Sequence, residues 1–298
     1  VVSFIIAAVF LLSVAYPLSG AFAESDTITI NNEEDFLEFA KNCQSDTWSQ
    51  GKKVVLTKDI DLSGKDFEPA ATFGGSFDAS GYTVSGVNIT SKGSYIGLFR
   101  YIQKGALVEN LTVSANVSPD GSKKYVGIIA GENSGTIKNC KVLGNVSAKA
   151  SVGGICGYIT ETGSVTGCVS AAFVTGESYT GGICGQNYGT VELCENQGKV
   201  NVNDNEQAKT IQDLDINIEN LRSSENVDTN TDTGGICGFS KGKITDCKNF
   251  GDVGYKSVGY NTGGICGRQS GYISACENYG KVNGRKDVGG ICGQAEPY

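Results

Sequence analysis

The chain has 298 residues, of which 39% are hydrophobic and 19% charged, and its formal net charge is −8. It contains no histidine, which excludes Ser-His-Asp and Cys-His nucleophile systems and every His-ligated metal site. The negative charge disfavours nucleic acid and anionic membrane surfaces as partners.

Residues 1–23 have the character of a secretory signal peptide. They carry no charged residue, contain an apolar run from Phe4 to Leu12, and end in the small-x-small sequence Ala21-Phe22-Ala23, as cleavage sites do. A membrane anchor is the alternative for this segment. No later apolar run approaches the roughly 20 residues needed to span a bilayer. We expect an exported protein and, because position 1 is not methionine, a true start that lies upstream.

Residues 24–66 predict an N-terminal cap in the order strand, helix, strand. Thr27–Ile30 alternates as a strand does. Asn32 is a favourable helix N-cap and three acidic residues follow it, while Phe36 and Phe39 recur at helical spacing. An amphipathic helix here would cover the open end of a coil. A ligand groove is the alternative use of the two phenylalanines.

Residues 67–298 are dominated by a repeat. Its unit is Gly-Gly-Ile-Cys-Gly, three or four residues, Gly, one residue, Ile or Val, two residues, Cys, and a Gly-x-Val close; clean copies are Gly181–Val200, Gly234–Val253 and Gly263–Val282. The cysteines that follow Gly-Gly-Ile lie 28, 53, 29 and 26 residues apart. The last copy is unfinished, so we expect the protein to continue beyond residue 298.

This period predicts stacked supersecondary units that are individually too small to bury a core. A rung of this length accommodates three strands of roughly 5 residues with their turns, and glycine marks the corners. The predicted fold is all-β, a right-handed parallel β-helix (a β-solenoid) with rungs ~4.8 Å apart. A short capping helix and one partly helical insertion complete it.

The insertion is predicted at residues 202–232, where the glycine punctuation stops. Ile211, Leu214, Ile218 and Leu221 follow a 3-4-3 spacing, which is one face of a helix. The segment is either a tolerated surface insertion, because long loops cost little stability, or a family-specific contact region.

Three asparagines and ten cysteines recur at fixed places in the repeat. The asparagines predict a structural ladder of side-chain amides, since identical turns stack. The cysteines form two columns, and disulfides, packed free thiols and a zinc or iron–sulfur site remain open. Packed thiols are favoured, because Ala130 fills a column position. The predicted structural residues are Gly154, Cys156, Gly182, Cys184, Cys194, Asn196, Gly235, Cys237, Cys247, Asn249, Gly264, Cys266, Cys276, Asn278 and Cys292.

One spacing requires a distortion within the rung. Ile273 and Cys276 are three residues apart, which places them on opposite faces of a flat strand. A bend or bulge must lie between them if both are buried.

Aspartates are the candidate catalytic groups, because enzymes of this architecture cut polysaccharides with aspartate clusters. The candidates do not form the tight pair that two-carboxylate hydrolysis requires, and we expect no catalytic, cofactor-binding or metal-binding residue. They are Asp59, Asp61, Asp66, Asp78, Asp228, Asp232 and Asp246.

From Val126 onward, the motif Gly-Gly-[Leu/Ile/Val]-x-Gly followed by Gly-x-Ile-x-x-Cys resembles the GLUG-motif repeats of bacterial surface and secreted proteins. The stretch upstream is similar to the lead-in of that family, from Asp59-Ile60-Asp61-Leu62-Ser63-Gly64 to Asn110-Leu111-Thr112-Val113. The resemblance implies a pectin-lyase-like β-helix outside the cell and no family-wide catalytic residue. Such repeats also accompany IgA-cleaving zinc metallopeptidases, whose peptidase motif does not occur here.

These observations predict a secreted or cell-surface repeat scaffold that serves adhesion or interaction, without cofactor and without activity of its own. Glycans or extracellular proteins are the expected partners. Two alternatives stay open: a polysaccharide lyase or glycosidase, because fold alone does not fix chemistry, and the repeat region of a larger surface peptidase.

Overall fold

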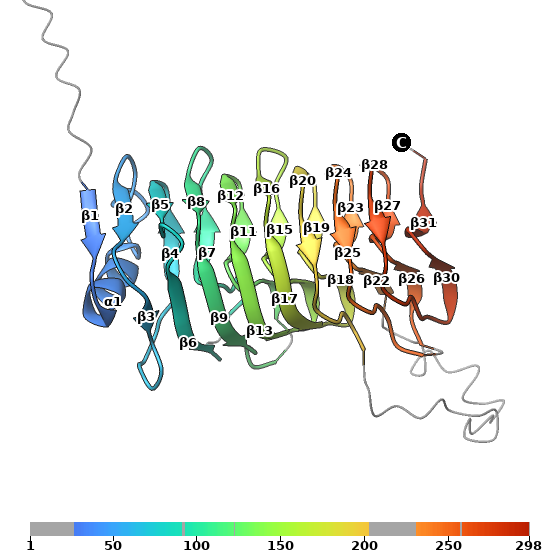
Figure 1. Cartoon of the computed structure of the whole chain (residues 1–298), viewed down its shortest axis with the longest axis horizontal. Helices are drawn as coiled ribbons and strands as arrows, with labels where there is room; N and C mark the ends of the chain where they lie inside the picture. The colour runs from blue at the N-terminus through green and yellow to red at the C-terminus, as the bar shows by residue number, and fades with distance from the viewer. Residues whose placement is uncertain (1–26, 91–92, 122, 203–230, 257, 298) are drawn as a thin grey trace, which may run out of the picture.

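The computed structural model describes residues 27–90, 93–121, 123–202, 231–256 and 258–297. Parallel strands stack along one axis into an elongated solenoid, with a helix at the N-terminal end (Figure 1). Every strand pairing among the described residues is parallel and joins strands of successive turns. The predicted all-β parallel β-helix with an N-terminal capping helix is therefore confirmed.

Four parallel sheets form the walls of the solenoid. Sheet A contains β1 (Thr27–Ile30), β2 (Lys53–Leu56), β5 (Ser76–Asp78), β8 (Leu107–Glu109), β12 (Thr136–Lys138), β16 (Ser164–Thr166), β20 (Thr190–Glu192), β24 (Lys243–Thr245) and β28 (Tyr272–Ser274). Sheet B contains β3 (Ile60–Asp61), β6 (Thr83–Ile89), β9 (Thr112–Val117), β13 (Lys141–Ser147), β17 (Val169–Thr175), β21 (Glu195–Asn196), β25 (Lys248–Asn249) and β29 (Glu277–Asn278).

The other two sheets meet at the corner that the repeat motif forms. Sheet C contains β4 (Ala70–Phe73), β7 (Phe99–Ile102), β11 (Ala130–Asn133), β15 (Cys156–Ile159), β19 (Cys184–Asn187), β23 (Cys237–Ser240), β27 (Cys266–Gln269) and β31 (Cys292–Ala295). Sheet D contains β10 (Lys124–Val126), β14 (Ala150–Gly153), β18 (Ser178–Gly181), β22 (Thr231–Gly234), β26 (Tyr260–Gly263) and β30 (Lys286–Gly289). Gly-Gly-Ile-Cys-Gly thus ends a strand of sheet D and begins the next strand of sheet C.

The second glycine of that motif lies against the next rung. A Cβ atom at Gly154, Gly182, Gly235 or Gly264 would come within 2.1–2.2 Å of the carbonyl oxygen of the equivalent glycine one rung on. Real Cβ atoms do not approach backbone so closely. Close packing of neighbouring chains, and not a special backbone angle, therefore requires glycine here.

The N-terminal cap forms because the first turn of its helix is capped. Asn32 accepts a hydrogen bond from the backbone N–H of Asp35 (2.8 Å), and the helix α1 runs from Glu33 to Asn42. Phe36 and Phe39 are buried, and the Phe39 ring lies 5.5 Å from the ring of Phe77 on β5. Both phenylalanines thus belong to the core that closes the N-terminal end. Strand β2 of the cap pairs with β5, so cap and solenoid are continuous.

A corner between sheets A and B resolves the three-residue spacing of Ile273 and Cys276. Ala275 between them has φ 52°, which is the left-handed region and turns the chain. Ile273 and Cys276 both pack against the core. Equivalent residues of earlier rungs, Asn139, Leu193 and Asp246 among them, also have positive φ, so this corner recurs along the solenoid.

The asparagines of the repeat form a hydrogen-bonded row. Asn196 Nδ2 donates to Asn249 Oδ1 (2.7 Å), and Asn249 Nδ2 donates to Asn278 Oδ1 (2.7 Å). Each Nδ2 also donates to the carbonyl two residues later in its own chain. The amides therefore join consecutive rungs through the interior.

The ten repeat cysteines stand in two columns and are free thiols. Cys156, Cys184, Cys237, Cys266 and Cys292 are paired in register along sheet C. Burial raises the pKa of the thiols of Cys184, Cys237 and Cys266. The second column follows sheet A, where each sulfur donates to the carbonyl oxygen two residues earlier (3.2–3.4 Å); its members are Cys140, Cys168, Cys194, Cys247 and Cys276.

Two predicted segments fall largely outside the described residues. The predicted signal peptide, residues 1–23, is one, and residues 203–230 of the predicted insertion are the other. On either side of the latter the stacking is uninterrupted, because Ser178 pairs with Thr231 and Cys184 with Cys237. Within the described ranges, no helix has the length and apolar character that a membrane crossing requires.

Candidate functional site

Each rung presents two outward positions at the junction of sheets D and C. The first, the corner column, lies two residues before the first glycine of the motif and consists of Tyr95, Tyr125, Ser151, Tyr179, Asp232, Asn261 and Asp287. All seven have φ between 54° and 61°, a region that few non-glycine residues adopt. Because the same angle recurs with four residue types, the corner itself imposes it.

The second position, the strand column, runs along the outer face of sheet C. Its members pair in register from rung to rung and are Tyr101, Glu132, Tyr158, Gln186, Phe239, Arg268 and Gln294. Rungs in a parallel sheet are ~4.8 Å apart, so large side chains of the two columns contact one another along the axis.

Aromatic rings of the two columns, together with Tyr188 directly after β19, form a continuous ladder. From Tyr101 the ring contacts lead to Tyr95 (4.9 Å between centroids), Tyr125 (4.7 Å, stacked) and Tyr158 (5.6 Å). Tyr188 follows, at 5.4 Å from Tyr158. These separations are in the range that aromatic pairs prefer. The aromatic ladder is completed by Phe239, which contacts Tyr188 and Tyr179, and comprises Tyr95, Tyr101, Tyr125, Tyr158, Tyr179, Tyr188 and Phe239.

The hydroxyl groups of the six ladder tyrosines are available to solvent or to a ligand. They are half-buried, and burial raises the pKa of Tyr95, Tyr101, Tyr158 and Tyr188. Among the described residues none forms a hydrogen bond to any of the six hydroxyl groups. The ladder therefore offers a row of rigid apolar rings with uncommitted donors and acceptors.

Glu132 interrupts the ladder in the strand column. It pairs in register with Tyr101 on one side and Tyr158 on the other. Its charge raises the pKa of Tyr95, Tyr101 and Tyr158, and burial raises the pKa of Glu132 itself. No described residue forms an ion pair or hydrogen bond with its carboxylate. Glu132 is therefore a partly buried carboxylate, adjacent to tyrosine rings, that lacks a hydrogen-bond or ion-pair partner among the described residues.

Glu132→Gln is expected to raise the stability of the protein at about pH 7 and to leave it unchanged at about pH 4. The ordinary pKa is 4.5 and the folded value is higher, so the folded state is favoured below 4.5 and loses that advantage as pH rises through the folded pKa. Thermal denaturation at both pH values checks this; the gain in Tm should stay below ~4 °C, as for 1 kcal/mol in a domain of this size. An equal shift at both values would contradict it.

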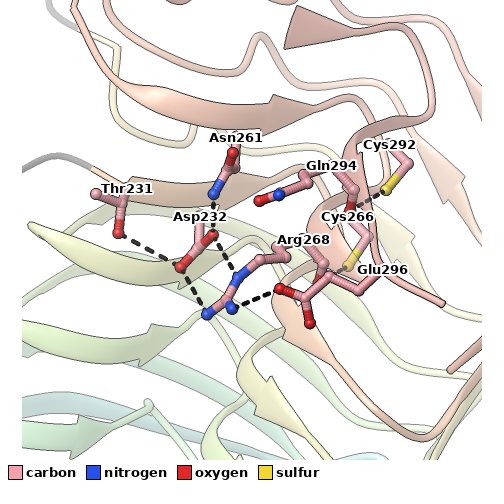
Figure 2. Close-up of polar contacts among 8 residues, drawn as sticks. All are labelled: Thr231, Asp232, Asn261, Cys266, Arg268, Cys292, Gln294 and Glu296. Carbon is pink, nitrogen blue, oxygen red and sulfur yellow. Dashed lines mark hydrogen bonds and ion pairs between the residues drawn. The ribbon is translucent and has the colours of Figure 1, made fainter. Parts of the chain in front are cut away.

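At the rung of β27, Arg268 lies between the carboxylates of Asp232 and Glu296 (Figure 2) and next to the last rings of the ladder. The Arg268 guanidinium carbon lies 4.7 Å from the Phe239 ring centroid and 5.9 Å from that of Tyr179. Its Nε donates to Asp232 Oδ1 (3.1 Å) and its Nη1 to Glu296 Oε1 (3.0 Å). Burial alone would lower the pKa of Arg268, but the hydrogen bonds to Glu296 and Asp232 raise it above its ordinary value.

Asp232 is the most enclosed member of this cluster. Its side chain is 5% exposed, against 24% for Arg268 and 35% for Glu296. Arg268 Nη2 and Asn261 Nδ2 also donate to the Asp232 carboxylate (3.3 and 2.8 Å). The charge of the Asp232 carboxylate is thus balanced by Arg268, and most of its hydrogen-bonding capacity is used by Arg268 and Asn261.

A hollow of about 840 Å³ adjoins the ladder at Tyr188. It is lined beside sheet A by Gly189, Gly242 and Gly271 of successive turns, each of which packs against the backbone of the turn before. Lys241 and Lys243 line it, and Lys241 Nζ lies 5.8 Å from the Tyr188 ring centroid. Tyr188 therefore belongs to both the ladder and the hollow.

The aspartates that the sequence suggested do not gather at this face. Asp61 accepts hydrogen bonds from Ser63 (2.7 and 3.0 Å), and Asp78 accepts from the N–H of Ser80 (2.7 Å), as turn residues do. Asp59 accepts from the N–H of Thr83 (2.7 Å). Asp228 lies outside the described residues. Among the candidates, Asp232 alone belongs to the cluster at the end of the ladder.

The ladder itself was not predicted from the sequence, although a signal existed. The corner column lies at a constant place before Gly, and the strand column lies two residues after the position of the motif cysteine. Tyrosine recurs at both positions, and the strand column adds Phe239 and Arg268. The constant positions of the repeat predict the fold, whereas the ladder consists of variable positions beside them.

Comparison with known proteins gives partial likenesses. No family model matches the chain. Halomucin of Haloquadratum walsbyi is 31% identical over 172 residues, which are 52% of this chain and 2% of halomucin. A protein of Evansella cellulosilytica named as a Gly-rich membrane protein is 34% identical over 105 residues, 31% of this chain and 12% of that protein. The chain thus spans a small fraction of the length of these curated relatives.

A solved structure resembles the chain over most of its length. A crystal structure from Bacteroides ovatus, of a protein described as a candidate immunoglobulin A1 protease, superposes with a TM-score of 0.59. The match covers 90% of this chain and 84% of that chain at 17% sequence identity. At this identity the likeness shows the fold.

Proposed function

We propose that the protein is a secreted or surface-displayed repeat scaffold that binds an extracellular ligand along its aromatic ladder without transforming it. The observation that carries the proposal is the ladder itself, seven contacting rings whose tyrosine hydroxyls have no partner among the described residues. Tyrosine gives large, rigid, amphipathic contact area at a low entropic cost, and aromatic residues are enriched where proteins recognise partners.

The relatives support a location outside the cell. One is a halomucin and the other is named as a membrane protein, and the apolar residues 1–23 end in a small-x-small sequence. We further propose that the repeats are of the GLUG type and form the repeat region of a longer surface protein, since both relatives are far longer than the matched segment. The ligand class is a glycan or an extracellular protein.

The test is binding of the whole chain to arrays of glycans and extracellular-matrix proteins. Tyr125→Ser combined with Tyr158→Ser should abolish binding, because it removes two contacting rings from the middle of the ladder. Tyr82→Ser is the matched control, since Tyr82 is exposed and lies outside the ladder. Loss of binding with Tyr82→Ser as well, or unchanged binding without Tyr125 and Tyr158, would refute the ladder as the binding surface.

A second candidate is a polysaccharide lyase or glycosidase, favoured by one observation. Asp232 and Glu296 bring two carboxylates together beside Arg268 on a single face of the solenoid, which is the residue set that such an enzyme requires. Both carboxylates are bound by the arginine, however, and Asp232 is nearly inaccessible. If product were released from the same arrays and this release were lost in Glu296→Gln, the protein would be an enzyme and the scaffold proposal would be wrong.

A further inference from the structure

Four tyrosines of the ladder form an arc beside Glu132. Consecutive ring contacts of 4.9, 4.7 and 5.6 Å join Tyr101, Tyr95, Tyr125 and Tyr158. Tyr101 and Tyr158 are the register neighbours of Glu132 on the two adjacent rungs, and the corner-column pair connects them past it. Glu132 thus occupies the strand-column position between Tyr101 and Tyr158, and its charge acts on three of the four rings.

The charge of Glu132 has no counterpart in this arc. The Arg100 side chain, whose residue precedes Tyr101, donates to the carbonyl oxygen of Ser94 (3.1 Å), and no described residue supplies an ion pair to Glu132. The titratable groups on which Glu132 acts are the phenols of Tyr95, Tyr101 and Tyr158 and the thiol of Cys156. The charge of Arg100 acts on Tyr101 as well, and that of Glu161 acts on Tyr158. The phenols and the thiol are neutral at ordinary pH, so the Glu132 carboxylate is the acidic group within the arc, with Arg100 and Glu161 near its two ends.

We propose that this arc, with Glu132 at its centre, binds the quaternary ammonium group of a choline-type ligand. Tyrosine rings attract cations through their π electrons, and the carboxylate adds a full opposite charge that lacks a partner in the protein. The inference rests on the proposed function, because it assigns a ligand group to part of the aromatic ladder.

Two alternatives fit the site less well. A neutral sugar would contact the tyrosine hydroxyls but would leave the Glu132 charge uncompensated in a half-buried place. A primary ammonium is strongly hydrated and requires three hydrogen-bond acceptors. A trimethylammonium group has no donor to satisfy, and its methyl groups pack against rings.

Calorimetric titration of the whole chain with choline and with 3,3-dimethyl-1-butanol tests the proposal. The alcohol is the neutral isostere of choline, so the difference in affinity isolates the charge. Choline should bind wild-type protein roughly 10-fold more tightly than the alcohol. Glu132→Gln should remove this preference, whereas Glu109→Gln, a glutamate of sheet A, should retain it.

The pH dependence gives a second measurement that requires no variant. Burial raises the pKa of Glu132 above 4.5, so acidification protonates the carboxylate and should abolish the preference for choline, while the phenols and the thiol stay neutral. Equal affinity for choline and the alcohol at neutral pH, or a preference that survives Glu132→Gln, would overturn the inference. Array binding that depends on Tyr125 and Tyr158 would still support the proposed function in that case.

Discussion

Gly182→Val is expected to lower the free energy of unfolding by more than ~3 kcal/mol, at the upper end of overpacking costs. A Cβ atom at Gly182 would lie 2.2 Å from the carbonyl oxygen of Gly235 and 2.3 Å from Cγ of Asn196. The first atom belongs to the backbone of the next rung and the second to the asparagine row, so neither moves cheaply. Thermal denaturation followed by circular dichroism should show a drop in Tm of at least ~6 °C.

Gly290 supplies the matched control for this substitution. It occupies the same place in the motif of the final described rung, and nothing lies within 4 Å of a Cβ built there. Gly290→Val should therefore change stability by no more than ~0.5 kcal/mol, as surface substitutions usually do. If both variants lost stability equally, the contact between rungs would not be the reason for glycine.

Arg268→Ala is expected to cost stability toward the lower end of the ~3–5 kcal/mol associated with breaking a buried ion pair. The substitution leaves the Asp232 carboxylate, 5% exposed, without its guanidinium, and it removes the cation from the rings of Phe239 and Tyr179. The lower end applies because the Arg268 side chain is 24% exposed. Urea denaturation measures the loss.

The double variant Arg268→Ala with Asp232→Asn separates the two causes. Asparagine tolerates the left-handed backbone of position 232 (φ 55°) and removes the uncompensated charge. It should recover most of the lost stability, and the remainder should report the ring contacts. No recovery would show that packing of the arginine, and not the charge of Asp232, stabilises this end of the ladder.

Repetition made most of the architecture predictable. The motif spacing predicted parallel rungs, because a period of this length is typical of stacked repeats. Asn32 and the acidic residues after it predicted the helix, because they are a local N-cap signal. The bend between Ile273 and Cys276 was inferred from side-chain alternation, and the left-handed Ala275 provides it. Local rules succeed where each rung repeats the geometry of the last.

The candidate site was less accessible to sequence reasoning. Residues 95, 101, 125 and 158 lie on three different rungs, and their contacts depend on the register between corner and strand columns. That Glu132 lacks a partner, or that Arg268 reaches back to Asp232, follows from three-dimensional placement alone. The architecture had also pointed to aspartates as catalytic groups. Asp61 and Asp78 instead accept hydrogen bonds from residues of their own turns, and Asp59 accepts one from Thr83.

Because of the two outward columns, the residues that form the outer surface of the solenoid differ from the residues that stabilise its fold. In the strand column the same backbone position accepts tyrosine, glutamate, glutamine, phenylalanine and arginine, while the first glycine of the motif recurs in each of these rungs. Duplication or exchange of a whole rung during evolution would then change the order of these outward residues along the axis. New surfaces could arise by recombination between repeats, with the interior unchanged from one version to the next.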